Sequence, residues 1–141
     1  MSLRSLRSII SGQPPATAEK TATVLEAAIL MKDKSKGALL VCDGTKLSGI
    51  FTERDALFRV IAAGRDPATT TLAEVMTPQP MTMTADEPFI KALKLMHTRG
   101  FRHLPVVDNG RPIGVVSARD ALDDDLYEMR VELAQRADER D

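Results

Sequence analysis

The feature that most constrains the fold is an internal repeat with an offset of 65 residues. When the sequence is shifted by that offset without gaps, Gln13–Leu57 lies on Pro78–Leu122. Thirteen positions are then identical: Pro15/Pro80, Thr17/Thr82, Ala27/Ala92, Leu30/Leu95, Met31/Met96, Leu39/Leu104, Val41/Val106, Asp43/Asp108, Gly49/Gly114, Arg54/Arg119, Asp55/Asp120, Ala56/Ala121 and Leu57/Leu122. A unit of this length that occurs twice favours a pair of small domains over a solenoid. Neither half would bury much apolar surface alone, so the two copies are expected to pack against each other.

Each copy shows the same order of expected elements: a strand, a helix, two strands that form a hairpin, and a second helix. Apolar residues at helical spacing indicate the helices, and short apolar runs between turn residues indicate the strands. In the first copy the elements are expected at Ala16–Ala18, Val24–Met31, Ala38–Cys42, Leu47–Phe51 and from Thr52 to Gly64. In the second copy they are expected at Met81–Thr84, from Asp86 to Met96, at Leu104–Val107, at Ile113–Val116 and from Ser117 onward.

Turn and cap residues separate these elements. Asp43-Gly44 and Asp108-Asn109-Gly110 are typical of hairpin turns. Asp86 is the expected N-cap of its helix and Pro88 suits the first turn. Gly64 is the expected C-terminal stop of the second helix in the first copy.

The expected fold class is therefore α+β, with two β-α-β-β-α repeats packed as a pseudo-two-fold pair. The helix at Val24–Met31 is apolar on nearly every side, which predicts deep burial. A turn of helix is expected at Leu72–Met76. The expected organisation is repeat 1 over residues 8–64, a linker over 65–76, repeat 2 over 77–125 and a charged helical tail over 126–141.

Composition excludes several classes of function. The 141 residues carry a formal net charge of −1, so no general basic field would recruit nucleic acid or an acidic membrane. The single cysteine, Cys42, excludes an internal disulfide and lies in an apolar run, which predicts a buried thiol. With no apolar run long enough to span a bilayer and no signal core, a cytoplasmic location is expected.

Catalytic and metal-binding patterns are not apparent. Two histidines and one distant cysteine do not have the spacing of metal ligands, and His97 is expected on a solvated helix face. The phosphate-binding loop of the nucleoside triphosphatases is missing, and no nucleophile is coupled to a base. The sequence therefore predicts neither an enzyme nor a metal protein.

One motif occurs in both copies: a hydroxyl residue followed three places later by an aspartate. These are Thr52 with Asp55 and Ser117 with Asp120, each at a junction between a strand and a helix. The pattern is that of a capping box, and for an isolated instance capping alone is the simpler interpretation. A helix start also presents free N–H groups, and an outward-turned aspartate can accept hydrogen bonds from two vicinal hydroxyls, as a ribose offers.

The order of elements and the motif phrases resemble cystathionine-β-synthase (CBS) domains. The resemblance covers residues 8–125 and is carried by the segments 49–55, 100–108 and 114–120. It implies a stand-alone pair of CBS domains that binds an adenosine nucleotide between its repeats. AMP is the smallest candidate ligand, and ADP, ATP, NAD(H) and S-adenosylmethionine share its adenosine group.

The resemblance also implies two sites, each shared between the repeats. Site A joins Thr52, Arg54 and Asp55 to Met81, Thr82, Arg102 and His103. Site B joins Ser117, Arg119 and Asp120 to Ala16, Thr17, Gly37 and Ala38. In each, the aspartate would hold ribose, and Arg102 and His103 would meet phosphate in site A. Since Gly37 and Ala38 occupy the matching positions in site B, site A is expected to bind phosphorylated ligands more tightly.

Two functions remain open. The first is a regulatory module in which nucleotide binding shifts the arrangement of repeats, with the output carried by another, unidentified protein chain. The second is a structural homodimerisation module with vestigial ligand sites. A homodimer is expected in either case, through the Val24–Met31 helix and through an apolar stripe in the tail. The stripe is formed by Leu126, Met129, Leu133 and Ala137. The alternative of equal weight is that the tail is a solvated extension. Leu3, Leu6, Ile9 and Ile10 are expected to form a short apolar turn over the core.

Overall fold

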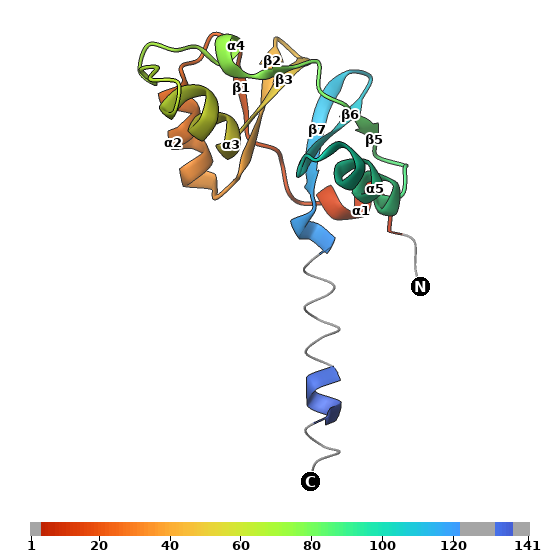
Figure 1. Ribbon diagram of the computed structural model, residues 1–141. Helices are drawn as coiled ribbons and strands as arrows, with labels where there is room; N and C mark the ends of the chain where they lie inside the picture. Colours follow the sequence, from red (N-terminus) through yellow and green to blue (C-terminus); the bar gives the residue numbers. More distant parts are fainter. Residues whose placement is uncertain (1–3, 122–131, 137–141) are drawn as a thin grey trace.

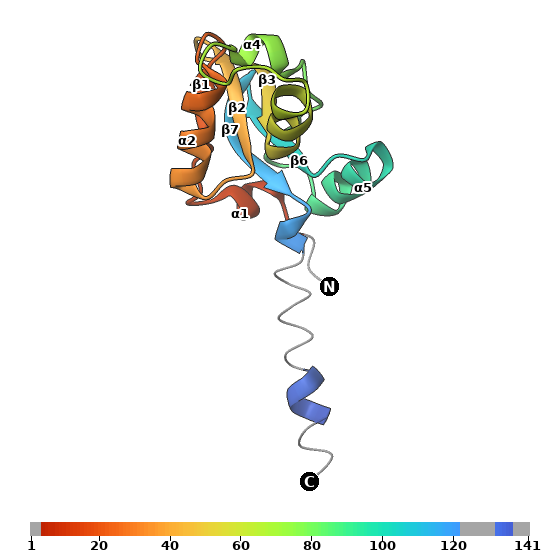
Figure 2. The same cartoon turned by 60° about the vertical axis from the view of Figure 1, so that its left-hand side comes forward.

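A computed structural model describes residues 4–121 and 132–136 of the protein. Two lobes lie side by side, one for each repeat, with their β-hairpins facing each other at the centre and the helices α2 and α5 on the outer sides (Figures 1 and 2). The first lobe contains β1 (Thr17–Glu19), α2 (Val24–Lys34), β2 (Ala38–Asp43), β3 (Lys46–Thr52) and α3 (Glu53–Asp55), which continues as a π-helical segment (Ala56–Ile61). The second contains β5 (Met83–Thr84), α5 (Phe89–Arg99), β6 (His103–Asp108) and β7 (Arg111–Ser117).

The strands form two small mixed sheets, as expected for an α+β pair. In the first lobe the order is β1-β2-β3-β4, where β4 (Thr77–Pro78) comes from the segment that joins the repeats. In the second lobe the order is β5-β6-β7. The first strand of each repeat pairs in parallel with the second, and the hairpin strands pair antiparallel. Each hairpin carries a register shift at the same place in the repeat, Val41/Cys42 and Val106/Val107. Both predicted hairpins are confirmed.

The short helical turn that precedes each repeat packs into the core of the other repeat. The turn α1 (Leu6–Ile10) precedes repeat 1, yet Leu6 is buried in the core of repeat 2. The turn α4 (Leu72–Val75) precedes repeat 2, and both of its terminal residues are buried in the core of repeat 1. Each lobe is therefore completed by the segment that leads into the other, and the predicted helical turns at both places are confirmed.

The exchange depends on two equivalent glycines. A Cβ atom at Gly114 would stand 2.6 Å from Cγ2 of Ile10. A Cβ atom at Gly49 would overlap the sulfur of Met76 and stand 2.9 Å from the carbonyl oxygen of Thr77. Cβ atoms do not approach other atoms this closely in proteins. The absence of a Cβ atom at both glycines therefore allows the helical turns to lie against the strands.

Two local expectations about the helices are corrected. Helix α2 buries Val24, Ala27 and Met31, but its Leu25 and Ile29 are 43% and 50% exposed, so the helix is not buried on all sides. Its apolar residues are divided between a core face and an outer face. Pro88, and not Asp86, is the N-cap of α5, and the Asp86 carboxylate pairs with Arg7 at 3.1 Å.

The end of one helix and the two ends of the chain account for the remaining differences. The helix after Thr52 ends at Ile61, earlier than expected, and Gly64 has a φ of 72° in the turn that follows. Residues 132–136 are helical and exposed, and the other stripe positions, Leu126, Met129 and Ala137, lie outside the described residues, as does Leu3. The homodimer expected from that stripe stays a prediction. The thiol of Cys42 is buried, as expected, and burial raises its pKa, with the charge of Glu19 adding to the effect.

The lobes meet through a small apolar contact at their hairpins. Ala38, Leu40 and Ile50 form its buried part, with Leu47 and Val115 against them. The backbone N–H of Leu47 donates to the carbonyl of Gly110 at 3.1 Å and ties the two hairpins directly. This contact fixes the distance between the lobes and leaves an open region next to it.

Candidate functional site

The motif of repeat 1 is a closed capping box. The N–H of Asp55 donates to the Thr52 hydroxyl at 3.2 Å, and the N–H of Thr52 donates to Oδ2 of Asp55 at 3.0 Å. The other carboxylate oxygen, Oδ1, lies 3.4 Å from Nε of Arg59. The guanidinium of Arg59 also donates to the carbonyls of Val75 and Met76, at 3.4 and 3.3 Å. Both oxygens of Asp55 are thus engaged, in a buried residue tied to the chain that joins the repeats.

The motif of repeat 2 is more open. The N–H of Ser117 donates to Oδ2 of Asp120 at 2.7 Å, which repeats half of the capping box. Within the part of the chain that the structure describes, Oδ1 of Asp120 has no hydrogen bond or ion pair. The position equivalent to Arg59 is Asp124, which cannot supply a cation. Asp120 therefore keeps an acceptor that could meet a ribose hydroxyl.

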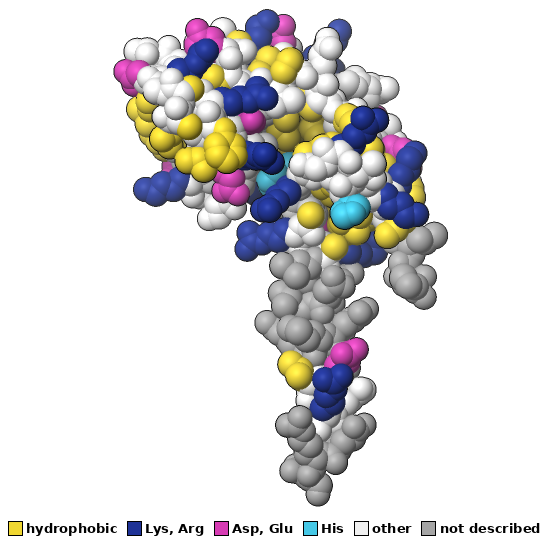
Figure 3. Space-filling view, in the orientation of Figure 1, with side chains coloured by type: hydrophobic (Ala, Val, Ile, Leu, Met, Phe, Trp, Pro, Cys, Tyr) yellow, Lys and Arg dark blue, Asp and Glu magenta, His cyan; other side chains and the backbone are white. Residues whose placement is uncertain are grey.

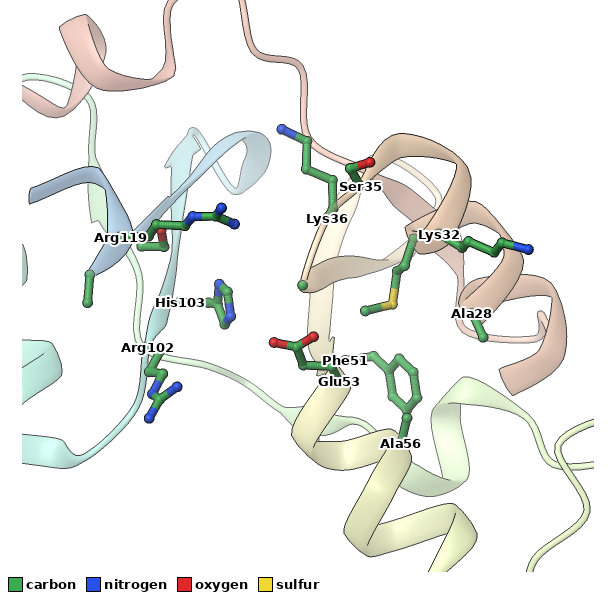
Figure 4. Close-up of a pocket in the computed structure, with 14 residues that line it drawn as sticks. Ala28, Lys32, Ser35, Lys36, Phe51, Glu53, Ala56, Arg102, His103 and Arg119 are labelled. Atoms are coloured by element: carbon green, nitrogen blue, oxygen red, sulfur yellow. The ribbon is translucent and has the colours of Figure 1, made fainter. Parts of the chain in front are cut away.

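Two adjoining cavities lie where the lobes meet, and Figure 4 shows the residues that line the larger one. The larger, about 870 Å³, is lined by Ala28, Met31, Lys32, Ser35, Lys36, Gly37, Phe51, Glu53, Ala56, Arg102, His103, Ser117, Ala118 and Arg119. The smaller, about 220 Å³, is lined by Gln13, Pro14, Pro15, Ala16, Ser35, Lys36, Gly37, Ala38, His103, Val115, Ser117, Arg119 and Asp120. Because six of these residues line both cavities, a single elongated ligand could occupy the two together.

The local fold explains how these residues reach the cleft. Helix α2 ends at Lys34, and its C-cap Ser35 has a left-handed backbone (φ 54°) that turns the chain toward Lys36 and Gly37. On the facing lobe, His103 begins β6, and Ser117 ends β7 directly opposite it in the strand register. The start of the helix after β7 then brings Arg119 and Asp120 to the same edge. The cleft therefore lies where these strands and helices begin or end.

The charges in the cleft are mostly positive. Lys32, Lys36, Arg102 and Arg119 line the larger cavity, with Glu53 as its acidic side chain. Basic side chains gather around the hollow between the lobes in the space-filling view (Figure 3). In Figure 4, His103 and Arg119 of repeat 2 point toward repeat 1, and Arg102 lies next to His103. A wall of this kind suits a phosphate, since arginine pairs with two phosphate oxygens at once.

His103 lies at the centre of this wall. Burial lowers its pKa below the ordinary value of 6.5 and is the largest influence; Arg102 lowers it further, while Glu53 and Asp120 raise it. The ring is close to the backbone of repeat 1, since a Cβ atom at Gly37 would stand 3.4 Å from its Cε1. A neutral imidazole in this position can gain a proton when an anion arrives.

The residues that line the two cavities differ in part from the members of sites A and B expected from the sequence. The members of site B line the smaller cavity, except Thr17, which pairs with Leu40 in the sheet. Of site A, Arg102 and His103 line the larger cavity, whereas Thr52, Arg54, Asp55, Met81 and Thr82 line neither of the two. Arg102 and His103, which are assigned to site A, thus lie beside Ser117 and Arg119 of site B. The lining of these two cavities favours the motif of repeat 2, and the assignment of residues to sites A and B stays a prediction.

Sequence reasoning missed part of the cleft. Gln13, Pro14 and Pro15 form one end of the smaller cavity, and Ala28, Met31 and Ala56 give the larger cavity an apolar wall. Glu53 lies within the segment 49–55 that carries the family resemblance, so its place in the sequence could have singled it out. The helix residues gave no such signal, because their exposure to a cleft depends on how the lobes are oriented.

Among residues 4–121 and 132–136, the structure shows no group of three or more His, Cys, Asp or Glu side chains that could hold a metal ion. None of the helices in the same residues has the length and apolar character needed to cross a membrane. His97 is exposed on α5, as expected.

Comparison with known proteins identifies the family. The sequence profile of the CBS domain matches residues 6–62 and again residues 72–126. The chain belongs to the CBS domain family. It is 39% identical over 114 residues to the CBS domain-containing protein CBSCBSPB2 of Arabidopsis thaliana and 32% identical over 123 residues to the uncharacterized protein MK0525 of Methanopyrus kandleri. These alignments cover 80% and 86% of this chain but 21% and 60% of the relatives, so the chain spans only part of their length.

Solved CBS structures share the fold. The CBS domain protein NE2398 superimposes with a TM-score of 0.81 at 28% identity, covering 89% of this chain and 99% of that one. PAE2072 of Pyrobaculum aerophilum, solved in complex with AMP, gives 0.76 at 25% identity, covering 83% and 89%. The CBS domain pair of MJ0100, solved with 5′-methylthioadenosine and S-adenosyl-L-methionine, gives 0.75 at 28% identity, covering 84% and 96%. CBS pairs similar to this chain therefore bind adenosyl compounds.

Proposed function

We propose that the protein is a non-catalytic regulatory module that binds an adenosine nucleotide in the cleft between its CBS repeats. The observation that carries this proposal is the open carboxylate oxygen of Asp120 beside a basic wall formed by Arg102, His103 and Arg119. Complexes of PAE2072 with AMP and of MJ0100 with adenosyl compounds support the ligand class.

The two cavities suggest how such a ligand would lie. Asp120 borders only the smaller cavity, so the ribose is assigned there, against the backbone of Ala16 and Ala38. Arg102 borders only the larger cavity, so the phosphates are assigned to that side. The basic lining favours AMP, ADP, ATP or NAD(H) over S-adenosylmethionine, which carries a positive charge. AMP is the simplest member of this class.

The arrangement of the repeats gives the ligand a regulatory effect. The ligand would touch both lobes, since the smaller cavity joins Gly37 of repeat 1 to Ser117 of repeat 2. Binding would then favour the lobe arrangement in which both halves reach the ligand. We place the repeats at 8–64 and 77–125, joined by 65–76, and assign the output to a separate protein in the cytoplasm.

A thermal-shift series with AMP, ATP, NADH and S-adenosylmethionine tests the proposal. A ligand that binds only the folded protein must raise the midpoint of unfolding. We expect the phosphorylated compounds to raise it and to be recovered unchanged after incubation. If none of the four does so at millimolar concentration, in protein shown free of retained ligand, nucleotide binding is refuted.

A second function is favoured by a specific observation. Leu57, Phe58 and Ile61 of the π-helical segment are 50%, 56% and 69% exposed, next to the outer face of α2. Such a surface suits a structural homodimerisation module. An acid extract of the purified protein that holds no adenosine compound, together with a dimer and no thermal shift, would favour this function.

A further inference from the structure

We propose that Glu53 is an internal counter-ion of the basic cleft, and that the phosphate of a bound nucleotide takes its place. Glu53 would then set how strongly the protein prefers phosphorylated ligands over adenosine itself. This inference rests on the proposed function, because it concerns the phosphate side of the same site.

The geometry places Glu53 opposite the basic wall. Glu53 is the first residue of α3 and extends from repeat 1 toward His103 and Arg102 of repeat 2 (Figure 4). All three line the larger cavity. No ion pair within 4.0 Å joins Glu53 to a basic side chain in the described parts of the chain. The opposite charges thus face each other across the space where a ligand would enter.

Gly37 shows how close this approach is. A Cβ atom at Gly37 would stand 3.2 Å from Oε1 of Glu53 and 3.4 Å from Cε1 of His103. The carboxylate and the imidazole therefore border the same small region of backbone. A side chain at Gly37 would have to displace one or the other.

The electrostatics follow from this position. Lys32, Lys36, Arg102 and Arg119 surround the larger cavity, and Glu53 is the acidic side chain among its lining residues. A phosphate monoester carries up to two negative charges near neutral pH, so it is attracted by the basic residues and repelled by Glu53. Because Glu53 is exposed, its carboxylate can turn into water when a phosphate enters. The repulsion lowers affinity for phosphate without obstructing the nucleoside.

This exchange would also link binding to movement of the lobes. In the ligand-free protein, Glu53 of repeat 1 attracts the basic wall of repeat 2 across the cleft. A phosphate that replaces Glu53 removes that attraction and supplies contacts of its own. The lobe arrangement in the nucleotide-bound protein can therefore differ from the lobe arrangement in the ligand-free protein.

The test compares Glu53→Gln with Glu26→Gln, a matched removal of one charge at an exposed position of α2 outside both cavities. Calorimetry with adenosine and with AMP gives the two affinities for each variant. We expect Glu53→Gln to bind AMP about three- to thirty-fold more tightly than the unmodified protein, with adenosine affinity unchanged. Glu26→Gln should bind both ligands as the unmodified protein does. Equal or weaker binding of AMP by Glu53→Gln, or an equal gain for adenosine, would overturn the inference.

A ligand-free measurement separates this inference from the proposed function. Since Glu53 raises the pKa of His103, Glu53→Gln should lower that pKa further, as followed by NMR of the imidazole signal, with the exposed His97 as internal reference. An unchanged pKa of His103 would show that Glu53 is not its counter-ion, whatever the nucleotide results. Failure of the unmodified protein to bind any nucleotide would instead refute the proposed function.

Discussion

At the scale of single residues, two copies of one motif have different partners. Asp55 closes a capping box and meets Arg59, whereas Asp120 keeps one carboxylate oxygen open. Four residues after each aspartate, the sequence has Arg59 in repeat 1 and Asp124 in repeat 2. A duplicated sequence can thus keep its capping function in both copies while only one remains open to a ligand.

His103 gives a prediction for the pH dependence of stability. Because burial lowers its pKa in the folded protein below 6.5, the unfolded chain binds more protons as the pH falls through that value. The free energy of unfolding should therefore decrease as the pH falls below about 6.5, a loss that is absent at higher pH. In His103→Gln this part of the loss should disappear, as measured by urea denaturation between pH 8 and pH 5.

The exposed His97 provides the control. His97→Gln should leave the pH dependence of the unmodified protein in place, because that side chain is exposed on α5. If His103→Gln loses stability with falling pH as steeply as the unmodified protein does, the assignment of the effect to His103 is wrong.

At the scale of elements, the exchanged turns α1 and α4 hold the pair together. Each turn fills the core of the lobe that it does not lead into, and each lies against an equivalent glycine. Gly114→Ala should push α1 away from β7, because the new methyl group would overlap Ile10. We expect a loss of roughly 1–3 kcal/mol in the free energy of unfolding, as for other overpacked sites, measured by chemical denaturation.

Gly49→Ala tests the same principle in the other lobe. Here the methyl group would meet Met76, which is flexible, and the carbonyl of Thr77, which is not. A loss in the same range is expected from the backbone contact. Full stability in both variants would mean that the turns do not need the close approach.

The sequence predicts the elements better than their arrangement. The 65-residue offset predicts the hairpins and helices because apolar spacing and turn residues are local properties. It does not predict that α1 crosses to the other lobe, since nothing local distinguishes the two cores. For the same reason the motifs can be located in the sequence, whereas the pairing of Arg102 and His103 with one motif or the other stays a prediction; both residues line the larger cavity together with Ser117. That pairing depends on the relative orientation of the lobes, which no local pattern encodes.

At the scale of the whole molecule, one lobe presents most of the exposed apolar surface. Its exposed large hydrophobic residues are Leu25 and Ile29 of α2 and Leu57, Phe58 and Ile61 of the π-helical segment. Hydrophobic side chains gather over these helices in Figure 3. The repeat-2 positions equivalent to Ile29 and Phe58 are Lys94 and Asp123. A homodimer formed by this surface would therefore join the first lobes of two chains.

Phe58→Glu tests that homodimer. A carboxylate in the centre of the apolar surface would have to be desolvated on both sides of a symmetric interface. We expect light scattering to report a dimer for the unmodified protein and a shift toward the 15.4 kDa monomer for the variant. Lys94→Glu, on the polar counterpart, should leave the dimer intact. Monomers in the unmodified protein at all practical concentrations would contradict the prediction.

The central claim is that one adenosine nucleotide binds through the motif of repeat 2, and titration calorimetry with AMP tests it most directly. The unmodified protein should bind one AMP per chain in its tight phase. Asp120→Asn should weaken that phase by roughly ten-fold or more, because the ribose contact becomes uncharged. Asp55→Asn should keep it, with lower stability from the weakened cap and the lost contact to Arg59. If Asp55→Asn abolishes the tight phase and Asp120→Asn retains it, the nucleotide is bound by the other motif and the account is wrong.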